Sequence, residues 1–143
     1  MNQEKKIIYS LDQVDSVAVE LASIAKKAAI MTFTGPLGAG KTTMVRSLLR
    51  ACGVKGTITS PTYTYVNLYK NSQGRTFYHF DLYRIESVDD FVQAGFNEYL
   101  YAPNSVALIE WPDIIAPLFF DNVCHVSIDY CPDLDKRVMI IKT

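Results

Sequence analysis

The pattern of hydrophobic and polar residues predicts alternating strands and helices in the first third of the chain. Residues 6–9 form a short apolar run typical of a strand, and Ser10 or Asp12 could cap a helix after it. Apolar residues of that helix recur at helical spacing, at Val14, Val17, Leu21 and Ile24. Residues 29–34 are almost continuously apolar, which is typical of a strand buried on both faces of a parallel sheet.

The rest of the pattern predicts a hairpin followed by further short elements. Residues 62–69 and 76–83 are rich in tyrosine, threonine and phenylalanine, and a turn of about four to six residues between them favours an antiparallel hairpin. Short helices are expected over 86–100, with a break near Gly95, and over 112–119, with Pro112 in the first turn. Further strands are expected over 106–109, 123–130 and 137–142.

These elements predict an α/β fold in a single domain that spans residues 1–143. We expect a mixed, mostly parallel sheet flanked by helices, with the antiparallel hairpin placed after the helix of residues 44–51. Gly53 ends that helix.

A glycine-rich motif lies between the strand at 29–34 and the helix at 44–51. Residues 35–42 read G-P-L-G-A-G-K-T, which is the P-loop pattern in its required setting of strand, loop and helix. Glycines allow successive backbone N–H groups to approach a phosphate, and the start of the helix adds its positive dipole end. Lys41 is therefore expected to reach the β- and γ-phosphates of a nucleotide, and the Thr42 hydroxyl to ligate Mg²⁺.

Composition and charge restrict the partners and the compartment. The 14 basic residues are balanced by 15 acidic residues, so the chain has no basic excess with which to grip nucleic acid by itself. We expect any contact with tRNA to be indirect. The apolar runs are far shorter than a membrane span, and the three cysteines lack zinc-site spacing, which together favour reduced thiols and a cytoplasmic location.

Two acidic residues end apolar runs and compete for the role of the acid that fixes Mg²⁺ or a water. Asp81 follows residues 77–80, and Glu110 follows residues 106–109. Glu110 ends the more continuous strand, because His79 interrupts the other run. Period-two geometry places His79 and Asp81 on one face of their strand. We expect both carboxylates near the metal, one of them through water, and the pattern does not rank them.

Four other residues have a structural or a functional interpretation, and two of them have both. Trp111 is either core or interface packing, or a lid over the nucleotide or a contact for a partner. His79 is either a hydrogen-bonded core histidine or a base. His125 is given a structural role only. Thr62, in an S-P-T segment about one helix length after the P-loop, is the candidate for a hydroxyl that senses the γ-phosphate.

Four motifs in order resemble one family. They are G-P-L-G-A-G-K-T-T at 35–43, S-P-T-Y-T at 60–64, H-F-D-L-Y-R at 79–84 and I-E-W-P at 109–112. Together they are similar to the bacterial TsaE family, also called YjeE, which supports the synthesis of threonylcarbamoyladenosine in tRNA. The resemblance covers residues from about 30 to 112, and other P-loop proteins share only the first motif.

The resemblance implies roles for named residues. ATP would bind to the loop at Gly38, Ala39, Gly40, Lys41, Thr42 and Thr43. Thr42 and Glu110 would lie at Mg²⁺, Asp81 would have the Walker-B role, and Thr62 would belong to a switch. The adenine pocket of the family draws on the start of the first helix and on the C-terminal strands, which points to Leu11 and Arg137.

The family also implies an activity and partners. Its members are weak ATPases that work with a complex of TsaB and TsaD, in which TsaD transfers the threonylcarbamoyl group to adenosine. One departure is Pro36, where members often have an acidic residue. Proline removes a backbone donor and fixes φ, so the first turn of the loop is expected to differ while the phosphate-binding half is kept.

Three functions follow from these observations. In the leading one, the chain is an ATPase in which Lys41 neutralises phosphate oxygens while Asp81 and Glu110 set the metal shell for attack by water. In the second, it is a nucleotide-gated binding module whose hydrolysis is incidental. A small-molecule kinase is the third, although 143 residues leave little room for an arginine-bearing lid. Arg84 is the nearest candidate for an arginine finger.

Overall fold

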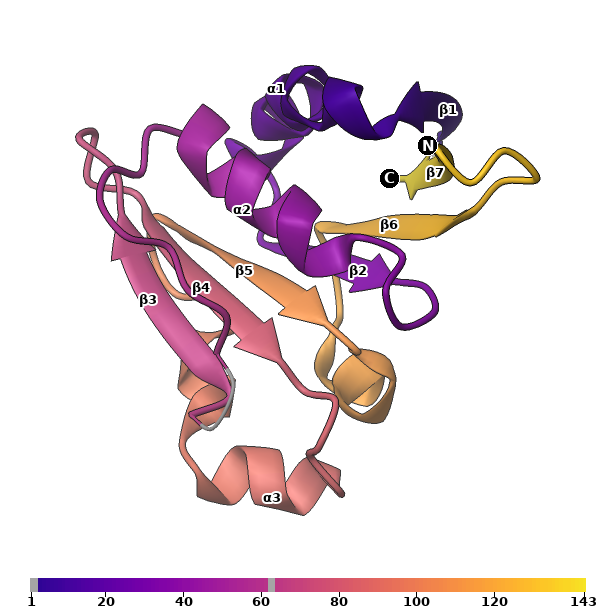
Figure 1. The fold of residues 1–143 in the computed structure, drawn as a ribbon. Coiled ribbons are helices and arrows are strands. Elements are labelled where there is room, and N and C mark those ends of the chain that lie inside the picture. The colour runs from indigo at the N-terminus through magenta and orange to yellow at the C-terminus, as the bar shows by residue number, and fades with distance from the viewer. Residues whose placement is uncertain (1–2, 62–63) are drawn as a thin grey trace.

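The computed structural model describes residues 3–61 and 64–143 and contains a seven-stranded sheet flanked by helices (Figure 1). The strands are β1 (Glu4–Ser10), β2 (Ile30–Thr34), β3 (Val66–Lys70), β4 (Thr76–Asp81), β5 (Ser105–Glu110), β6 (Val123–Tyr130) and β7 (Lys136–Lys142). The α-helices are α1 (Val14–Ala25), α2 (Lys41–Ala51) and α3 (Val88–Gln93), and the 3₁₀ helices are η1 (Leu11–Gln13), η2 (Phe96–Tyr99) and η3 (Asp113–Leu118).

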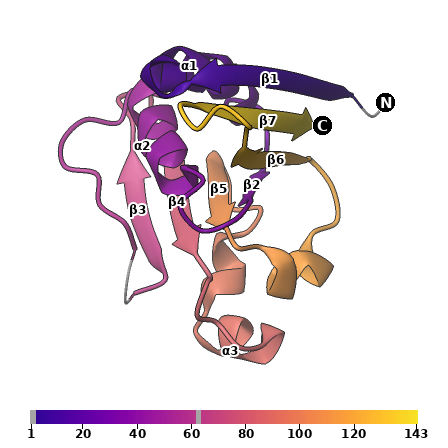
Figure 2. The ribbon, with the colours of Figure 1, turned by 45° about the vertical axis from the view of Figure 1, so that its right-hand side comes forward.

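The strand order is β1-β7-β6-β2-β5-β4-β3, and the four central strands run parallel to one another. The two edges are antiparallel: β3 pairs with β4 as a hairpin, and β7 pairs with both β6 and β1. Figure 2 shows β1 and β7 side by side at one edge. The predicted α/β class, mixed sheet and hairpin are confirmed, with the parallel part confined to the centre.

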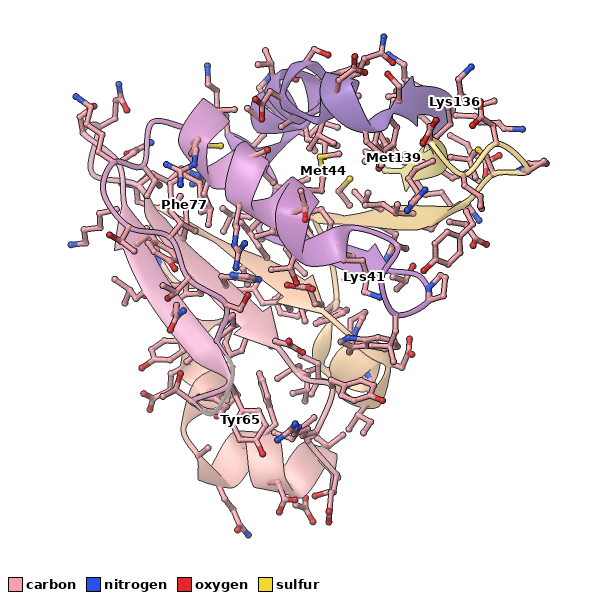
Figure 3. All side chains as sticks on the ribbon, viewed as in Figure 1. Lys41, Met44, Tyr65, Phe77, Lys136 and Met139 are labelled. Atoms are coloured by element: carbon pink, nitrogen blue, oxygen red, sulfur yellow. The ribbon has the colours of Figure 1, made fainter. Side chains whose placement is uncertain are left out.

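Two apolar clusters cover the two faces of the sheet. On one face α1 and α2 pack against alternate residues of the strands, among them Phe33. Phe77 and Met139 belong to the same cluster and are labelled in Figure 3. On the other face lie α3, η2 and η3, with Phe80 and Phe91 packed together at a ring separation of 5.5 Å. Covered on both sides, β2 is buried along nearly its whole length, as its continuous apolar sequence predicts.

Two predicted elements differ from the structure. The segment at 112–119 is a 3₁₀ helix that begins after Pro112, and Pro117 inside it lacks the amide hydrogen that a regular α-helix needs. The first strand of the hairpin starts at Val66 instead of residue 62, because Tyr65 has a left-handed backbone with φ of 66°. Residues 62 and 63 lie outside the described residues.

Two further findings concern the cysteine thiols and the length of the helices. Cys52, Cys124 and Cys131 are free, and burial raises the pKa of both the Cys52 and the Cys124 thiol to about 11. Both thiols therefore stay protonated and act as small apolar groups. Among the helices that the structure describes, none is long and apolar enough to cross a membrane.

Candidate functional site

The carboxyl ends of the parallel strands β2, β4 and β5 lie at the same end of the sheet, and the glycine-rich loop follows β2 there. A cavity of about 300 Å³ opens there. Its lining residues are Leu37, Gly38, Gly40, Lys41, Thr42, Thr43, Asp81, Tyr83, Glu110 and Trp111. Open α/β sheets bind ligands at the carboxyl ends of their strands, because loops and helix N-termini converge there. Seven predicted site residues thus line one cavity.

The loop is shaped by glycines that no other residue replaces easily. Gly35 has φ of 142°, and a Cβ atom at this position would lie closer than 3.0 Å to the carbonyl oxygen of Ile128 in β6. Gly40, with φ of 104°, is the residue before α2, so the backbone turns directly from the loop into the helix. The loop is therefore packed against the sheet at its start and against a helix N-terminus at its end.

Lys41 begins α2, and its side chain bends back over the loop (Figure 3). Its ammonium group donates to the carbonyl oxygens of Gly35 and Pro36, the latter at 3.0 Å, and lies 3.9 Å from the centroid of the Trp111 ring. Burial lowers the pKa of Lys41, and the negative charges of Glu110 and Asp81 oppose that shift. The loop carbonyls and the indole ring thus hold the amine at the cavity wall.

Strand register places the two candidate acids side by side, with Asp81 opposite Glu110 in the parallel pair of β4 and β5. Glu110 is buried and bonded by two side chains. Its Oε1 accepts from the Thr42 hydroxyl at 2.7 Å, and its Oε2 lies 2.6 Å from Nε2 of His79. Asp81 instead accepts from the backbone N–H of Tyr83 at 3.1 Å. The two carboxylates are neighbours in different environments.

The environment of Asp81 also affects its protonation. Burial raises the pKa of the Asp81 carboxyl above its usual value, while the hydrogen bond from the Tyr83 N–H lowers it and the nearby Glu110 raises it. A carboxylate of this kind gains from a cation or a hydrogen-bond donor brought into the cavity. The surroundings of Asp81 therefore suit it to a positively charged ligand.

The aromatic and histidine candidates are found in different surroundings. Trp111 has φ of 59°, lines the cavity, lies 4.9 Å from the Tyr83 ring and also packs partly against the second apolar cluster. A role as a lid or as a partner contact stays a prediction. His79 is fully buried and hydrogen-bonded, and its partner is the site carboxylate Glu110. His125 is exposed and bonds through Nδ1 to the buried hydroxyl of Thr32 at 2.7 Å.

Other predicted residues lie outside the cavity. Leu11 is 51% exposed at the start of η1, and Arg137 donates from Nε to the carbonyl of Ala39 at 3.1 Å, on the outer side of the loop. Ala39 itself is buried in the core. Arg84 lines a separate hollow of about 260 Å³. Thr62 lies outside the described residues.

A tyrosine that the sequence analysis did not single out also holds the loop. The hydroxyl of Tyr130 donates to the carbonyl of Leu37 at 2.7 Å, and the guanidinium of Arg137 lies 4.7 Å from the Tyr130 ring centroid. No motif marks Tyr130, because it is brought to the loop only by the pairing of β6 with β2.

The donor set fits Mg²⁺ that arrives together with phosphate. The cavity offers the Thr42 hydroxyl and the carboxylates of Asp81 and Glu110, all of them hard oxygen donors. Across residues 3–61 and 64–143, no three or more side chains of the types His, Cys, Asp and Glu gather as a metal cage. Mg²⁺ in nucleotide sites usually keeps one or two carboxylates and takes its other ligands from phosphate and water.

A larger hollow of about 560 Å³ lies elsewhere, beside the end of η3 and the start of β6. It has no glycine-rich loop and one carboxylate, from Asp121. The hollow is larger, but of the two only the smaller cavity combines residues of the glycine-rich loop with a lysine and two carboxylates.

Comparisons with known proteins agree with the motifs. The model of the family described as "Threonylcarbamoyl adenosine biosynthesis protein TsaE" matches residues 8–138. The Haemophilus influenzae protein named tRNA threonylcarbamoyladenosine biosynthesis protein TsaE is 37% identical over 82% of this chain and 73% of its own length. The Bacillus subtilis protein of the same name is 33% identical over 96% of this chain and 85% of its own length. The crystal structure of Bacillus subtilis YdiB superimposes with a TM-score of 0.74 at 26% identity, covering 100% of this chain and 87% of that one.

Proposed function

The chain belongs to the TsaE family of threonylcarbamoyl adenosine biosynthesis proteins, and we propose that it acts in making threonylcarbamoyladenosine in tRNA by binding and slowly hydrolysing Mg·ATP. The observation that carries this proposal is the single cavity in which the P-loop, Lys41, Thr42 and two carboxylates converge.

The loop and the start of α2 would bind the phosphates. Gly40 precedes the N-terminal end of an eleven-residue helix, where unpaired backbone N–H groups and the helix dipole favour negative charge. The N–H of Ala39 is already used within the loop, where it donates to the carbonyl of Pro36 at 3.2 Å. Lys41 would exchange the carbonyls of Gly35 and Pro36 for phosphate oxygens, which are the stronger acceptors because they are charged. The amine would also leave the face of Trp111.

We assign different roles to the two acids. Glu110 already holds the Thr42 hydroxyl at 2.7 Å, which supports a place for this pair beside the metal. Asp81, bonded to the backbone of Tyr83, would orient a water molecule, either at the metal or in line with the γ-phosphate. A bound Mg²⁺ would neutralise charge on the phosphate oxygens during hydrolysis.

Slow hydrolysis by the isolated chain follows from the charges in the cavity. Lys41 is the one cationic side chain among the described residues that line it, and Arg84 lies at a different hollow. Phosphoryl transfer sites without an arginine finger are slower by several orders of magnitude. We propose that TsaB- and TsaD-like partners supply the missing charge or close the cavity. Contact with tRNA would pass through these partners, since the chain has a net charge of −1.

The alternative of a nucleotide-gated binding module is favoured by the same missing cation. If ATP occupancy alone changed the affinity for a partner, hydrolysis would be incidental. The two functions differ in a reconstituted modification reaction that contains TsaB- and TsaD-like proteins and tRNA. Sustained product formation over many cycles with a non-hydrolysable ATP analogue would favour gating alone. A reaction that is sustained by ATP and stops with the analogue would favour the ATPase.

Calorimetry with Mg·ATP tests the binding site directly. The wild-type chain, alone or with its partners, is expected to bind, and Lys41→Ala to lose binding. Trp111 fluorescence provides a second readout, because the indole ring contacts the Lys41 ammonium. Absence of heat for the wild-type chain under both conditions would refute the proposed function.

A further inference from the structure

His79 lies in the core beneath the cavity and does not line it. It is fully buried in β4, and its register partner in β5 is Leu108. Two residues earlier on the same face of β4, Phe77 belongs to the apolar cluster. A buried imidazole among such neighbours costs free energy unless it is hydrogen-bonded, so its partner explains why it is tolerated.

That partner connects three elements of the fold. Nε2 of His79 lies 2.6 Å from Oε2 of Glu110, and Oε1 of Glu110 lies 2.7 Å from the Thr42 hydroxyl. The chain of contacts runs from β4 through β5 to the first turn of α2. Both oxygens of the Glu110 carboxylate are thus held, one by the sheet and one by the P-loop helix.

The position of the proton follows from the surroundings of the ring. Among the residues that the structure describes, Nδ1 of His79 has no hydrogen-bond partner. We therefore place the ring N–H that faces the site on Nε2, so that His79 donates a hydrogen bond to Oε2 of Glu110.

From this geometry we propose that His79 is a positioning residue for the Mg²⁺ site: its Nε2–H fixes one oxygen of Glu110, so that the other is aimed at Thr42 and the cation bound beside it. The proposal rests on the proposed function, because it needs Mg·ATP in the cavity. Hydrogen-bonding partners of metal ligands typically change metal affinity 10- to 100-fold when they are removed.

The neighbouring acid provides a comparison within the same cavity. Asp81 is bonded to a backbone N–H of Tyr83, two residues along its own chain. Glu110 is instead held by side chains from two other elements. His79 thus acts on one carboxylate of the pair, and its removal should weaken the binding of Mg²⁺ more than the binding of the phosphates.

The test compares two side chains of equal length at position 79. The amide of His79→Gln can place its N–H near the position of Nε2, whereas His79→Met has the same reach and no donor. Calorimetry measures the affinity for a non-hydrolysable ATP analogue with saturating Mg²⁺ and with EDTA. The quantity of interest is the factor by which Mg²⁺ tightens binding. Thermal unfolding without nucleotide reports on the fold of each variant.

We expect His79→Met to reduce that factor by about 10- to 100-fold and His79→Gln to restore most of it. In a Glu110→Gln background, His79→Met should cause no further reduction, because His79 acts through Glu110. An unchanged factor in His79→Met, or equal losses in the Met and Gln variants, would overturn the inference.

If His79→Met does not fold, His79→Asn replaces it, since its shorter amide mimics Nδ1 and cannot reach Glu110. His79→Asn should then lose the Mg²⁺ effect that His79→Gln keeps, and equal behaviour of the two would overturn the inference. A wild-type chain that binds no analogue would instead refute the proposed function.

Discussion

Substitution of Gly35 by alanine tests whether packing of the loop against the sheet controls nucleotide binding. Gly35 combines φ of 142° with a carbonyl oxygen of Ile128 less than 3.0 Å from where a Cβ atom would lie. That oxygen belongs to β6, which pairs with β2 on one side and β7 on the other. The sheet cannot move away easily, so the start of the loop must shift.

The expected magnitude has two parts. A left-handed backbone costs an alanine about 1–2 kcal/mol, and overpacking against a fixed neighbour adds about 1–3 kcal/mol. Gly74 is the matched control, because its φ is 83° and no atom lies within 4 Å of its added Cβ. We therefore expect Gly35→Ala to destabilise the fold by about 2–5 kcal/mol and Gly74→Ala by about 1–2 kcal/mol.

Urea unfolding followed by circular dichroism gives both stabilities, and calorimetry with Mg·ATP gives the affinities at a temperature where both variants are folded. A displacement of about 1 Å in such a site can cost about 100-fold, so Gly35→Ala should bind at least about ten times more weakly than wild type. Gly74→Ala, in the turn between β3 and β4, should bind as wild type does. Equal stability losses, or wild-type affinity in a folded Gly35→Ala, would refute this account of the loop.

The remaining predictions concern charge. Lys41→Ala should weaken Mg·ATP binding by about 100-fold or more in calorimetry, because the phosphates lose their charged donor; wild-type affinity would contradict this. Asp81→Asn and Glu110→Gln should each lower Mg²⁺-dependent ATP turnover by about 100-fold with an unchanged circular dichroism spectrum; turnover near wild type would remove that residue from the site. Burial raises the pKa of the Tyr9 hydroxyl to about 12, so the neutral form stabilises the fold below pH 10 and this contribution is lost between pH 10 and 12. Relative to Tyr9→Phe, wild type should lose about 1.4 kcal/mol of stability by pH 11 in urea unfolding, and a pH-independent difference would contradict the shift.

The sequence predicts the parts of this molecule that depend on local patterns. The continuous apolar runs correspond to β2 and β5, and the glycine motif falls between β2 and α2 as its setting requires. Alternation along residues 76–83 correctly placed His79 and Asp81 on one face. These features could be read from the chain because strand alternation and glycine backbones act over a few residues.

Features that depend on strand order could not be predicted from local sequence patterns. Nothing local shows that β4 lies beside β5, so the pairing of Asp81 with Glu110 and the bond from His79 to Glu110 could not be predicted. The contact of Tyr130 with the loop has the same origin. The 3₁₀ form of residues 113–118 agrees with Pro117, whose missing amide hydrogen is a local signal already present in the sequence.

The charges in the cavity indicate where nucleotide affinity must come from. Lys41 contributes one positive charge and Asp81 and Glu110 two negative charges, which leaves the described lining at −1 before any nucleotide binds. Side-chain charge alone would therefore repel a triphosphate. The attraction has to come from backbone N–H groups, the N-terminus of α2 and a cation that accompanies the phosphates.

Backbone donors act only when the loop keeps its shape. That shape is held from outside the cavity, by the packing of Gly35 on β6 and by the bonds of Arg137 and Tyr130 to loop carbonyls. Residues that never touch a phosphate can therefore change nucleotide affinity as much as those that do.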